Sequence, residues 1–248
     1  MSSRKYISFI AFSLTLVLGA HSCFAIDGKV YSPQVNKGEW ELEFAGTRTF
    51  DNDKAKNDIQ ENQFSVGYGI TDYWAAEIYY ATFERGPGEP QDFTANEFEN
   101  IFQFWPIGKY WVDAGLLASY HLAAKRDAAD SVELKLLLQK DIGRFTALGN
   151  FGGEREVGSH SAPGNDLSSA VNIRYRWLRY FEPGIELQSS YGTWDDHASF
   201  NQQEHYLGPI VYGELIPGLK YEAGLYTGIS TASAATAGRF KIEYEIYF

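Results

Sequence analysis

The chain has 248 residues and a formal net charge of −11, and this acidic balance argues against nucleic acid as a partner. Aromatic residues make up 16% of the sequence, and the tyrosines and tryptophans among them favour membrane–water interfaces. Beyond the first 25 residues, charges interrupt every apolar stretch, so the sequence predicts no membrane-spanning helix there.

The N-terminus has the three parts of a secretory signal peptide. Arg4 and Lys5 form a basic start, and residues 7–20 form an uncharged, mostly apolar run that is shorter than the ~20 residues of a membrane-spanning helix. Cys23 and Ala25 stand at the −3 and −1 positions of a cleavage site, so we expect a signal peptide at residues 1–25. Cys23 could instead be the lipidated cysteine of a lipoprotein, but the preceding Ala20-His21-Ser22 fits a lipidation signal poorly. The mature protein would contain no cysteine, which excludes disulfides and cysteine-based metal sites.

Residues 26–37 are expected to form a short periplasmic segment, and residues 38–248 a single domain of strands. In that domain, apolar residues recur at every second position in runs separated by turn-rich gaps. The runs predict about twelve strands, near residues 39–50, 64–70, 74–80, 93–105, 110–121, 132–139, 144–154, 167–177, 182–191, 206–212, 219–229 and 238–248. Short gaps alternate with long ones, which are residues 51–61, 85–92, 122–130, 158–166, 193–203 and 230–237.

Each run separates an apolar face from a polar one. In the first run, Trp40 and Leu42 lie on one face and glutamates lie on the other, because side chains alternate between the faces of a strand. In the tenth run, the same pattern places Tyr206, Ile210 and Tyr212 on the apolar face. These faces predict which residues point outward and which point inward if the strands close into a barrel.

The last run alternates with almost no error and ends on an aromatic residue. An uncovered apolar strand at the edge of a soluble sheet is an aggregation hazard, whereas in a closed membrane barrel lipid covers the apolar face and the first strand covers the edge. A terminal strand of this kind resembles the assembly signal of bacterial outer-membrane barrels. The resemblance implies that the barrel-assembly machinery is a partner and that Tyr244, Ile246 and Phe248 belong to the signal.

A soluble antiparallel barrel or sandwich is the competing fold, and it would bury one face of every strand in a dry core. The non-aromatic faces here carry one charge after another, which a dry core cannot hold and a wet lumen can. The sequence therefore predicts an all-β fold, a transmembrane antiparallel up-and-down β-barrel of about 12 strands in the lipid of the bacterial outer membrane. Both termini are expected to face the periplasm, and the long gaps are expected to be external loops.

The predicted inner face carries two zones of charge, with acids on the first, third, fourth and ninth strands and bases on the eighth, eleventh and twelfth. Because closure puts the last strand beside the first, Arg239 and Lys241 are expected to pair with glutamates of the first strand. The network is either a scaffold that fills a narrow lumen or a selectivity filter for ions and polar solutes. Its predicted members are Glu39, Glu41, Glu43, Glu77, Glu97, Glu99, Arg174, Arg176, Glu182, Glu186, Lys220, Arg239, Lys241, Glu243 and Glu245.

Catalytic, cofactor-binding and metal sites are not apparent in the sequence. His197-Ala198-Ser199 matches the His-x-Ser pattern of a lipid A deacylase, but it lies in an expected loop and not on a lipid-facing strand, where that chemistry would occur. Asp195 and Asp196 next to His197 could bind a cation, although loops of this composition are usually only solvated. We therefore expect no enzyme activity, no cofactor and no metal.

Two passages resemble a known group of barrels. Val66 to Trp74 resembles a strand–turn–strand passage of bacterial outer-membrane transporters grouped with the phenol-degradation (meta-pathway) barrel proteins, and Lys37 to Glu43 resembles relatives of that group. The resemblance implies a barrel with a transport role and assigns no site residues. We expect a passive channel or uptake barrel for small, unidentified solutes. The alternatives are a structural or adhesion barrel with a plugged lumen and a barrel hydrolase that acts on lipids.

Overall fold

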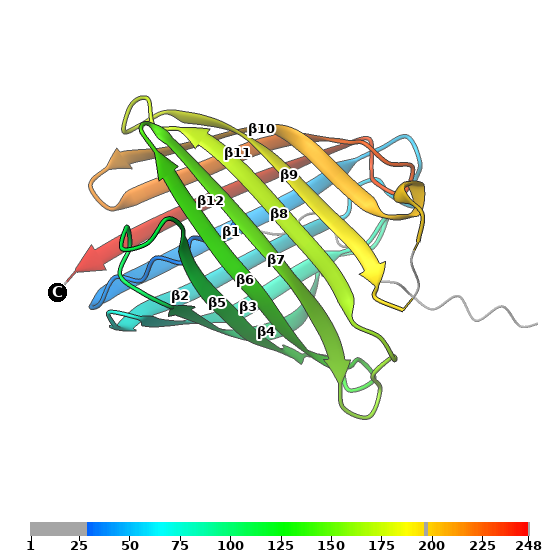
Figure 1. Cartoon of the computed structure of the whole chain (residues 1–248). Helices are drawn as coiled ribbons and strands as arrows, with labels where there is room; N and C mark the ends of the chain where they lie inside the picture. The colour runs from blue at the N-terminus through cyan, green and yellow to red at the C-terminus, as the bar shows by residue number, and fades with distance from the viewer. Residues whose placement is uncertain (1–28, 196–197, 248) are drawn as a thin grey trace, which may run out of the picture.

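The structure, a computed structural model, describes residues 29–195 and 198–247, which form one closed β-barrel. Twelve antiparallel strands follow one another around the barrel in chain order, and the last strand pairs with the first (Figure 1). This confirms the predicted up-and-down barrel with an even number of strands. Within the described ranges, no helix is long and apolar enough to cross a bilayer.

The strands are 10 to 13 residues long, which suits strands that cross a bilayer at a tilt. Their bounds are β1 (Glu39–Phe50), β2 (Gln60–Thr71), β3 (Trp74–Arg85), β4 (Asp92–Gln103), β5 (Asp113–Ala123), β6 (Asp130–Ile142), β7 (Phe145–Val157), β8 (Asp166–Tyr175), β9 (Glu182–Thr193), β10 (Glu204–Ile216), β11 (Leu219–Gly228) and β12 (Thr236–Tyr247). A single turn of 3₁₀-helix, η1 (Phe200–Gln202), lies before β10.

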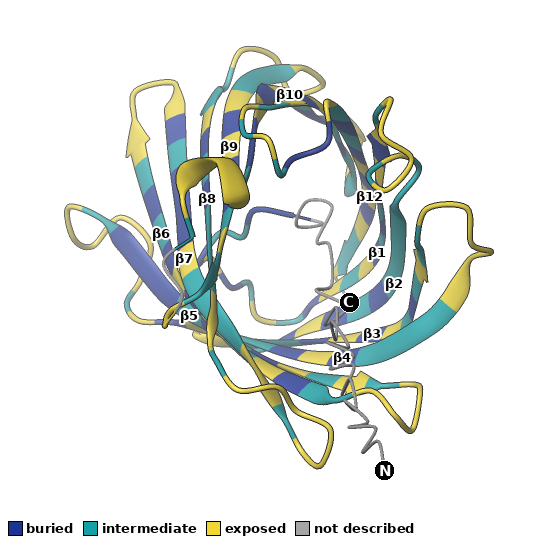
Figure 2. Ribbon diagram, turned by 90° about the vertical axis from the view of Figure 1, so that its right-hand side faces the viewer, coloured by how far each residue is buried: buried dark blue, intermediate teal, exposed yellow. Residues whose placement is uncertain are grey.

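The outer surface of the barrel is apolar and aromatic. Burial alternates along the strands (Figure 2), and the outward residues include Leu42, Ile78, Leu134, Ile185 and Leu225, each with a large exposed fraction. Aromatic rings also pair across neighbouring outward positions of the strands. A surface of this kind is unfavourable in water and favourable against lipid, because lipid covers the apolar side chains.

The two ends of the barrel differ. The loop end carries the connections at residues 51–59, 86–91, 124–129, 158–165, 194–195 with 198–203, and 229–235, and the turn end carries the others, together with the start of β1 and the end of β12. The connection at residues 104–112 is longer than the tight turn expected there, so β5 begins later than predicted. The predicted signal peptide and Phe248 lie outside the described residues. That the turn end faces the periplasm stays a prediction.

The closing seam lies between β1 and β12, as the sequence predicted. Leu42 is opposite Tyr244 and Phe44 is opposite Ile242 on the lipid-facing side. On the lumen side, Glu43 is opposite Glu243. Like charges at directly opposite positions destabilise a strand pair, so this seam requires cations nearby in the lumen.

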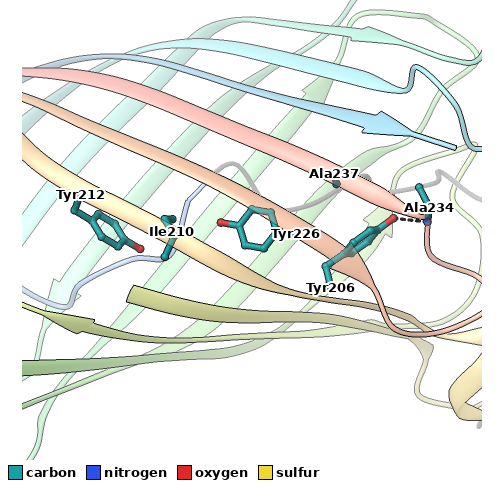
Figure 3. Close-up of a cluster of buried hydrophobic side chains, with 6 residues drawn as sticks. All are labelled: Tyr206, Ile210, Tyr212, Tyr226, Ala234 and Ala237. Carbon is teal, nitrogen blue, oxygen red and sulfur yellow. Dashed lines mark hydrogen bonds between the residues drawn. The ribbon is translucent and has the colours of Figure 1, made fainter. Parts of the chain in front are cut away.

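The apolar face predicted for the tenth strand is wrong. Tyr206, Ile210 and Tyr212 of β10 are buried and point into the lumen, where they form a cluster with Tyr226 of β11 and small residues near β12 (Figure 3). Leu207, two residues before Pro209 on the same strand, is exposed and faces outward instead. The interior of the barrel is therefore partly filled by aromatic side chains.

Candidate functional site

The N-terminal segment, residues 29–37, runs through the interior of the barrel (Figure 2). Its contacts with lumen-facing side chains include Tyr31 N–H to Asn150 Oδ1 at 2.7 Å, Ser32 Oγ to Gln139 Oε1 at 2.7 Å and Val35 N–H to Gln103 Oε1 at 2.9 Å. The sequence analysis did not foresee these contacts, because they join residues that are 68 to 119 positions apart. They bind the segment to β4, β6 and β7.

Glycines on the barrel wall leave room for this segment. A β-carbon at Gly69 would lie 1.9 Å from the carbonyl oxygen of Asn36, and one at Gly115 would lie 3.0 Å from Cβ of Pro33. Because the first of these obstacles is backbone, a side chain at position 69 would force the segment away from β2. Gly69 therefore has a role in the lumen as well as in its strand.

Lys29 anchors the segment to two carboxylates. Its Nζ lies 2.8 Å from Glu77 Oε2 and 3.2 Å from Glu43 Oε2, and all three residues are buried. The hydroxyl of Tyr31 donates to a third carboxylate, Glu99. The segment thus places one cation and one hydroxyl donor among the acids of β1, β3 and β4.

On the opposite side of the lumen, Glu186 is the centre of a buried polar cluster. Its carboxylate accepts hydrogen bonds from side chains of β8, β9, β10, β11 and β12, and it has no exposed surface. We call these residues the Glu186 cluster, and they are Asn172, Glu186, Gln188, Tyr212, Tyr226 and Arg239. A buried carboxylate that is bound by side chains of five strands makes its part of the lumen rigid.

A chain of ion pairs connects the Glu186 cluster to the N-terminal segment. Arg239 contacts Glu222 at 3.5 Å, and Lys241 contacts Glu222 at 3.0 Å and Glu43 at 3.3 Å. Glu43 also binds Lys29, so the chain continues to β3. The predicted pairing of Lys241 with the first strand is confirmed.

The predicted pairing of Arg239 with the first strand is wrong, because its guanidinium pairs with Glu186 of β9 and Glu222 of β11. Alternation along β11 could have placed Glu222 in the lumen, whereas no pattern pointed to Lys29 or Tyr31. The other predicted residues make these contacts: Glu39 accepts from Asn36 and Tyr247, Glu41 lies beside Glu43 and Glu77, Glu97 pairs with His121, Arg174 with Glu182, Arg176 with Asp141, and Lys220 with Glu243 and Glu245.

The described residues line a larger and a smaller cavity beside these filled regions. The loop-end cavity has a volume of about 650 Å³ and lies against β2 to β7, from loop residues such as Pro87 and Ala128 down to Lys29 and Tyr31. The turn-end cavity has a volume of about 80 Å³ and lies on the other side of the N-terminal segment. The larger cavity therefore lies off the barrel axis, against β2 to β7, and the segment separates it from the smaller one.

Acidic side chains outnumber basic ones around the loop-end cavity. It is lined by seven glutamates, against four lysine or arginine side chains and one histidine. The glutamates are Glu61, Glu84, Glu97, Glu99, Glu133, Glu154 and Glu156. An excess of carboxylates in a pore attracts cations and repels anions.

The structure gives no support to a lipid hydrolase at the His-x-Ser passage. His197 lies outside the described residues, and Ser199 caps η1 through contacts with Gln202. A serine and a histidine do meet on the outer face, where Ser189 Oγ lies 2.9 Å from His205 Nδ1. Both are buried, and the ring of Phe200 stacks on His205 at 4.4 Å, so this contact is covered by a loop.

No protein-family model matches the chain, and no curated protein matches its sequence. Its fold is similar to that of solved structures. A KdgM porin in complex with disordered oligogalacturonate is similar with a TM-score of 0.54 at 8% sequence identity, over 84% of this chain and 99% of that chain. At this identity the likeness concerns the fold alone.

Two other similar structures have TM-scores that are too low to support an inference. They are the Salmonella typhi outer membrane phospholipase dimer with bound calcium (TM-score 0.43, 12% identity, 93% of this chain and 94% of that chain) and OccK11 from Pseudomonas aeruginosa (0.39, 11%, 86% and 68%). The closed 12-strand barrel and its apolar, aromatic outer surface are together the structure of a bacterial outer-membrane β-barrel.

Proposed function

We propose that this chain is a passive outer-membrane channel for small solutes that prefers cations. The observation that carries the proposal is the loop-end cavity, a hollow of about 650 Å³ lined by seven glutamates inside a membrane barrel. A purely structural barrel has no need of such a hollow. Side-chain charges that line a wet pore select ions by sign, because the low-dielectric wall makes their field strong.

Bilayer electrophysiology tests this function. The purified, folded barrel is inserted into planar bilayers that separate two KCl solutions of different concentration. We expect a measurable current and a reversal potential of the sign that K⁺ selectivity produces. Current without selectivity would remove the cation preference, and the absence of current at every voltage and salt concentration would contradict the channel itself.

A plugged structural barrel is the second candidate, and the N-terminal segment is the observation that favours it. The segment crosses the lumen, and the Glu186 cluster fills the opposite side. Liposome swelling with neutral solutes of graded size separates the two functions, because a plugged barrel passes none of them. The resemblance to the phenol-degradation barrel group stays a prediction, and a lipid-hydrolase function has no support from the described residues.

A further inference from the structure

The N-terminal segment separates two cavities that lie along the same wall. The loop-end cavity ends at Lys29 and Tyr31, and the turn-end cavity is lined by Val35 and Asn36. Glu99 lines both cavities, one on each side of the segment. Displacement of the segment would therefore join the cavities into one passage along β2, β3 and β4.

Lys29 holds a primary ammonium group at the point where this passage would run. Its Nζ binds Glu77 at 2.8 Å and Glu43 at 3.2 Å. Carboxylate oxygens of Glu41, Glu43 and Glu77 lie within 4.8 Å of one another. Without Lys29, these three carboxylates would face one another with Lys241 still bound to Glu43, and a second cation would be strongly favoured there.

Glu99 offers a further acceptor beside this position. Its Oε1 accepts a hydrogen bond from Tyr31, and its side chain is buried. Among the residues that the structure describes, none donates a hydrogen bond to its Oε2. A buried carboxylate oxygen without a donor is unfavourable unless a ligand or water supplies one. Glu99 lines the loop-end cavity, and this oxygen is covered while the segment is in place.

We propose that Glu43, Glu77 and Glu99 form a binding site for the primary ammonium group of a permeating organic cation, and that Lys29 occupies this site while the barrel is closed. The inference rests on the proposed channel function and names its substrate class, small compounds that carry a protonated primary amine. The ammonium group of the solute replaces Lys29 between the carboxylates, the N-terminal segment leaves, and the cavities join. The exchange preserves the charge of the site.

The chemistry of the site favours a primary ammonium group over other cations. Such a group has three N–H donors, and the site offers it three carboxylates in a region that is buried from water. A quaternary ammonium group has no N–H to donate. A divalent metal ion is the competing occupant, because three clustered carboxylates also suit Ca²⁺. The experiment must therefore separate butylammonium from calcium.

Calorimetry of the purified full barrel in detergent measures this binding directly, with n-butylammonium chloride as the probe. Lys29→Gln removes the tethered ammonium group, and we expect butylammonium to bind about tenfold more tightly than to the wild type. Lys37→Gln, an exposed lysine on the same segment, is the matched control and should bind as the wild type does. Tetramethylammonium chloride and n-butanol should show no gain with Lys29→Gln.

Two more variants keep the test decisive. Glu77→Gln added to Lys29→Gln should remove the gain. Heat-modifiable migration shows whether Lys29→Gln folds. If this variant does not fold, Tyr31→Phe is used in its place. Tyr31→Phe keeps Lys29 but removes the hydrogen bond to Glu99, and it should tighten butylammonium binding several-fold. Equal affinity in the wild type and in the folded variant would overturn the proposal.

A gain for CaCl₂ without a gain for butylammonium would assign the site to a divalent ion and would also overturn the proposal. Because calorimetry needs no current, these outcomes are independent of the bilayer experiment that tests the channel function. A barrel that conducts, but whose Lys29→Gln variant binds butylammonium no more tightly than the wild type, refutes the ammonium site and leaves the channel function standing. A barrel that binds butylammonium as expected but carries no current refutes the channel alone.

Discussion

The guanidinium of Arg239 contacts both oxygens of the Glu186 carboxylate, Nη1 to Oε1 at 2.8 Å and Nη2 to Oε2 at 2.9 Å, and neither side chain has exposed surface. The two residues lie 53 positions apart, on β12 and β9. The pair therefore passes β11 and β10 on the lumen side and joins the closing strand β12 to β9.

Loss of Arg239 should destabilise the barrel strongly. Arg239→Met leaves the Glu186 carboxylate buried without its cation, and removing one partner of a buried ion pair costs about 3–5 kcal/mol in the free energy of unfolding. The double variant Glu186→Gln with Arg239→Met should recover much of this loss, because no buried charge then remains unpaired. Urea unfolding in lipid vesicles, followed by tryptophan fluorescence, measures both. Arg126→Met, in an exposed loop, is the control; an equal effect there would contradict the explanation.

A charge on the lipid-facing side of β12 should block assembly. Ile242 lies in the middle of the strand, opposite Phe44 and Tyr221, and points outward. An arginine at such a position costs about 2–4 kcal/mol near the bilayer centre. Gln63→Arg, on the lumen side of β2 at the loop-end cavity, should be tolerated. The measurement is the heat-modifiable fraction in outer membranes, and similar folded fractions would show that the faces are assigned wrongly.

A disulfide should lock the N-terminal segment in place. Val30 lies in one buried cluster with Ala170 of β8 and Leu148 of β7. In the double variant Val30→Cys with Ala170→Cys, oxidation should lower the bilayer current several-fold below that of the same protein after reduction, because the segment can then no longer leave the passage. Each single cysteine variant is a control and should be indifferent to reductant. A current that does not respond to reduction of a confirmed crosslink would show that the segment does not control permeation.

Acid should release the loop at residues 51–59. Its Asp58 accepts a hydrogen bond from Gln60 and pairs with Arg85 at 2.6 Å and Arg48 at 2.7 Å. The hydrogen bond from Gln60, with these arginines, lowers the pKa of Asp58 below its ordinary value. A lowered pKa means that the stabilisation is complete above the unfolded value of ~3.9 and is lost as the pH falls through the folded value.

A spin label at Asn52 reports this release as increased mobility in acid. With Asp58→Asn, the label should be mobile at neutral pH as well, whereas Asp127→Asn in another exposed loop should leave it unchanged. A label whose mobility does not depend on pH in the wild type would show that Asp58 does not hold the loop.

The wall of the barrel could be predicted from the sequence, and much of its interior could not. Alternation gives the faces of β1 and β12, and closure makes them neighbours, so the seam and the contact of Lys241 with Glu43 follow. Arg239 has a side chain long enough to reach past β11 and β10 to Glu186 of β9, and strand order alone does not limit that reach. The strand β10 has apolar residues on both faces, so its alternation is ambiguous. Tyr212 turns inward, where its hydroxyl reaches Glu186.

The path of the N-terminal segment could not be predicted from the sequence, for a different reason. Residues 29–37 have no period that would indicate a face, and Tyr31 meets Asn150 only because the finished barrel brings them together. The glycines that admit the segment, such as Gly69, can equally be explained by the strand or turn in which they stand. The periodicity of neighbouring residues carries no information on contacts between an irregular segment and strands that are distant in the sequence.

The loop-end cavity lies on one side of the barrel and the Glu186 cluster on the other, so the two sides can be engineered separately. Among the described residues, the lining of the loop-end cavity comes from β2 to β7, the loops at residues 51–59, 86–91 and 124–129, and the N-terminal segment, and the loop at residues 158–165 contributes nothing to it. An epitope tag or a fluorescent domain inserted near Ser161, which is exposed, would therefore leave this cavity intact, and its accessibility on whole cells would test the prediction that the loop end is external. The strands of the Glu186 cluster would keep the barrel folded. The residues that line the loop-end cavity could then be substituted independently to change which solutes pass.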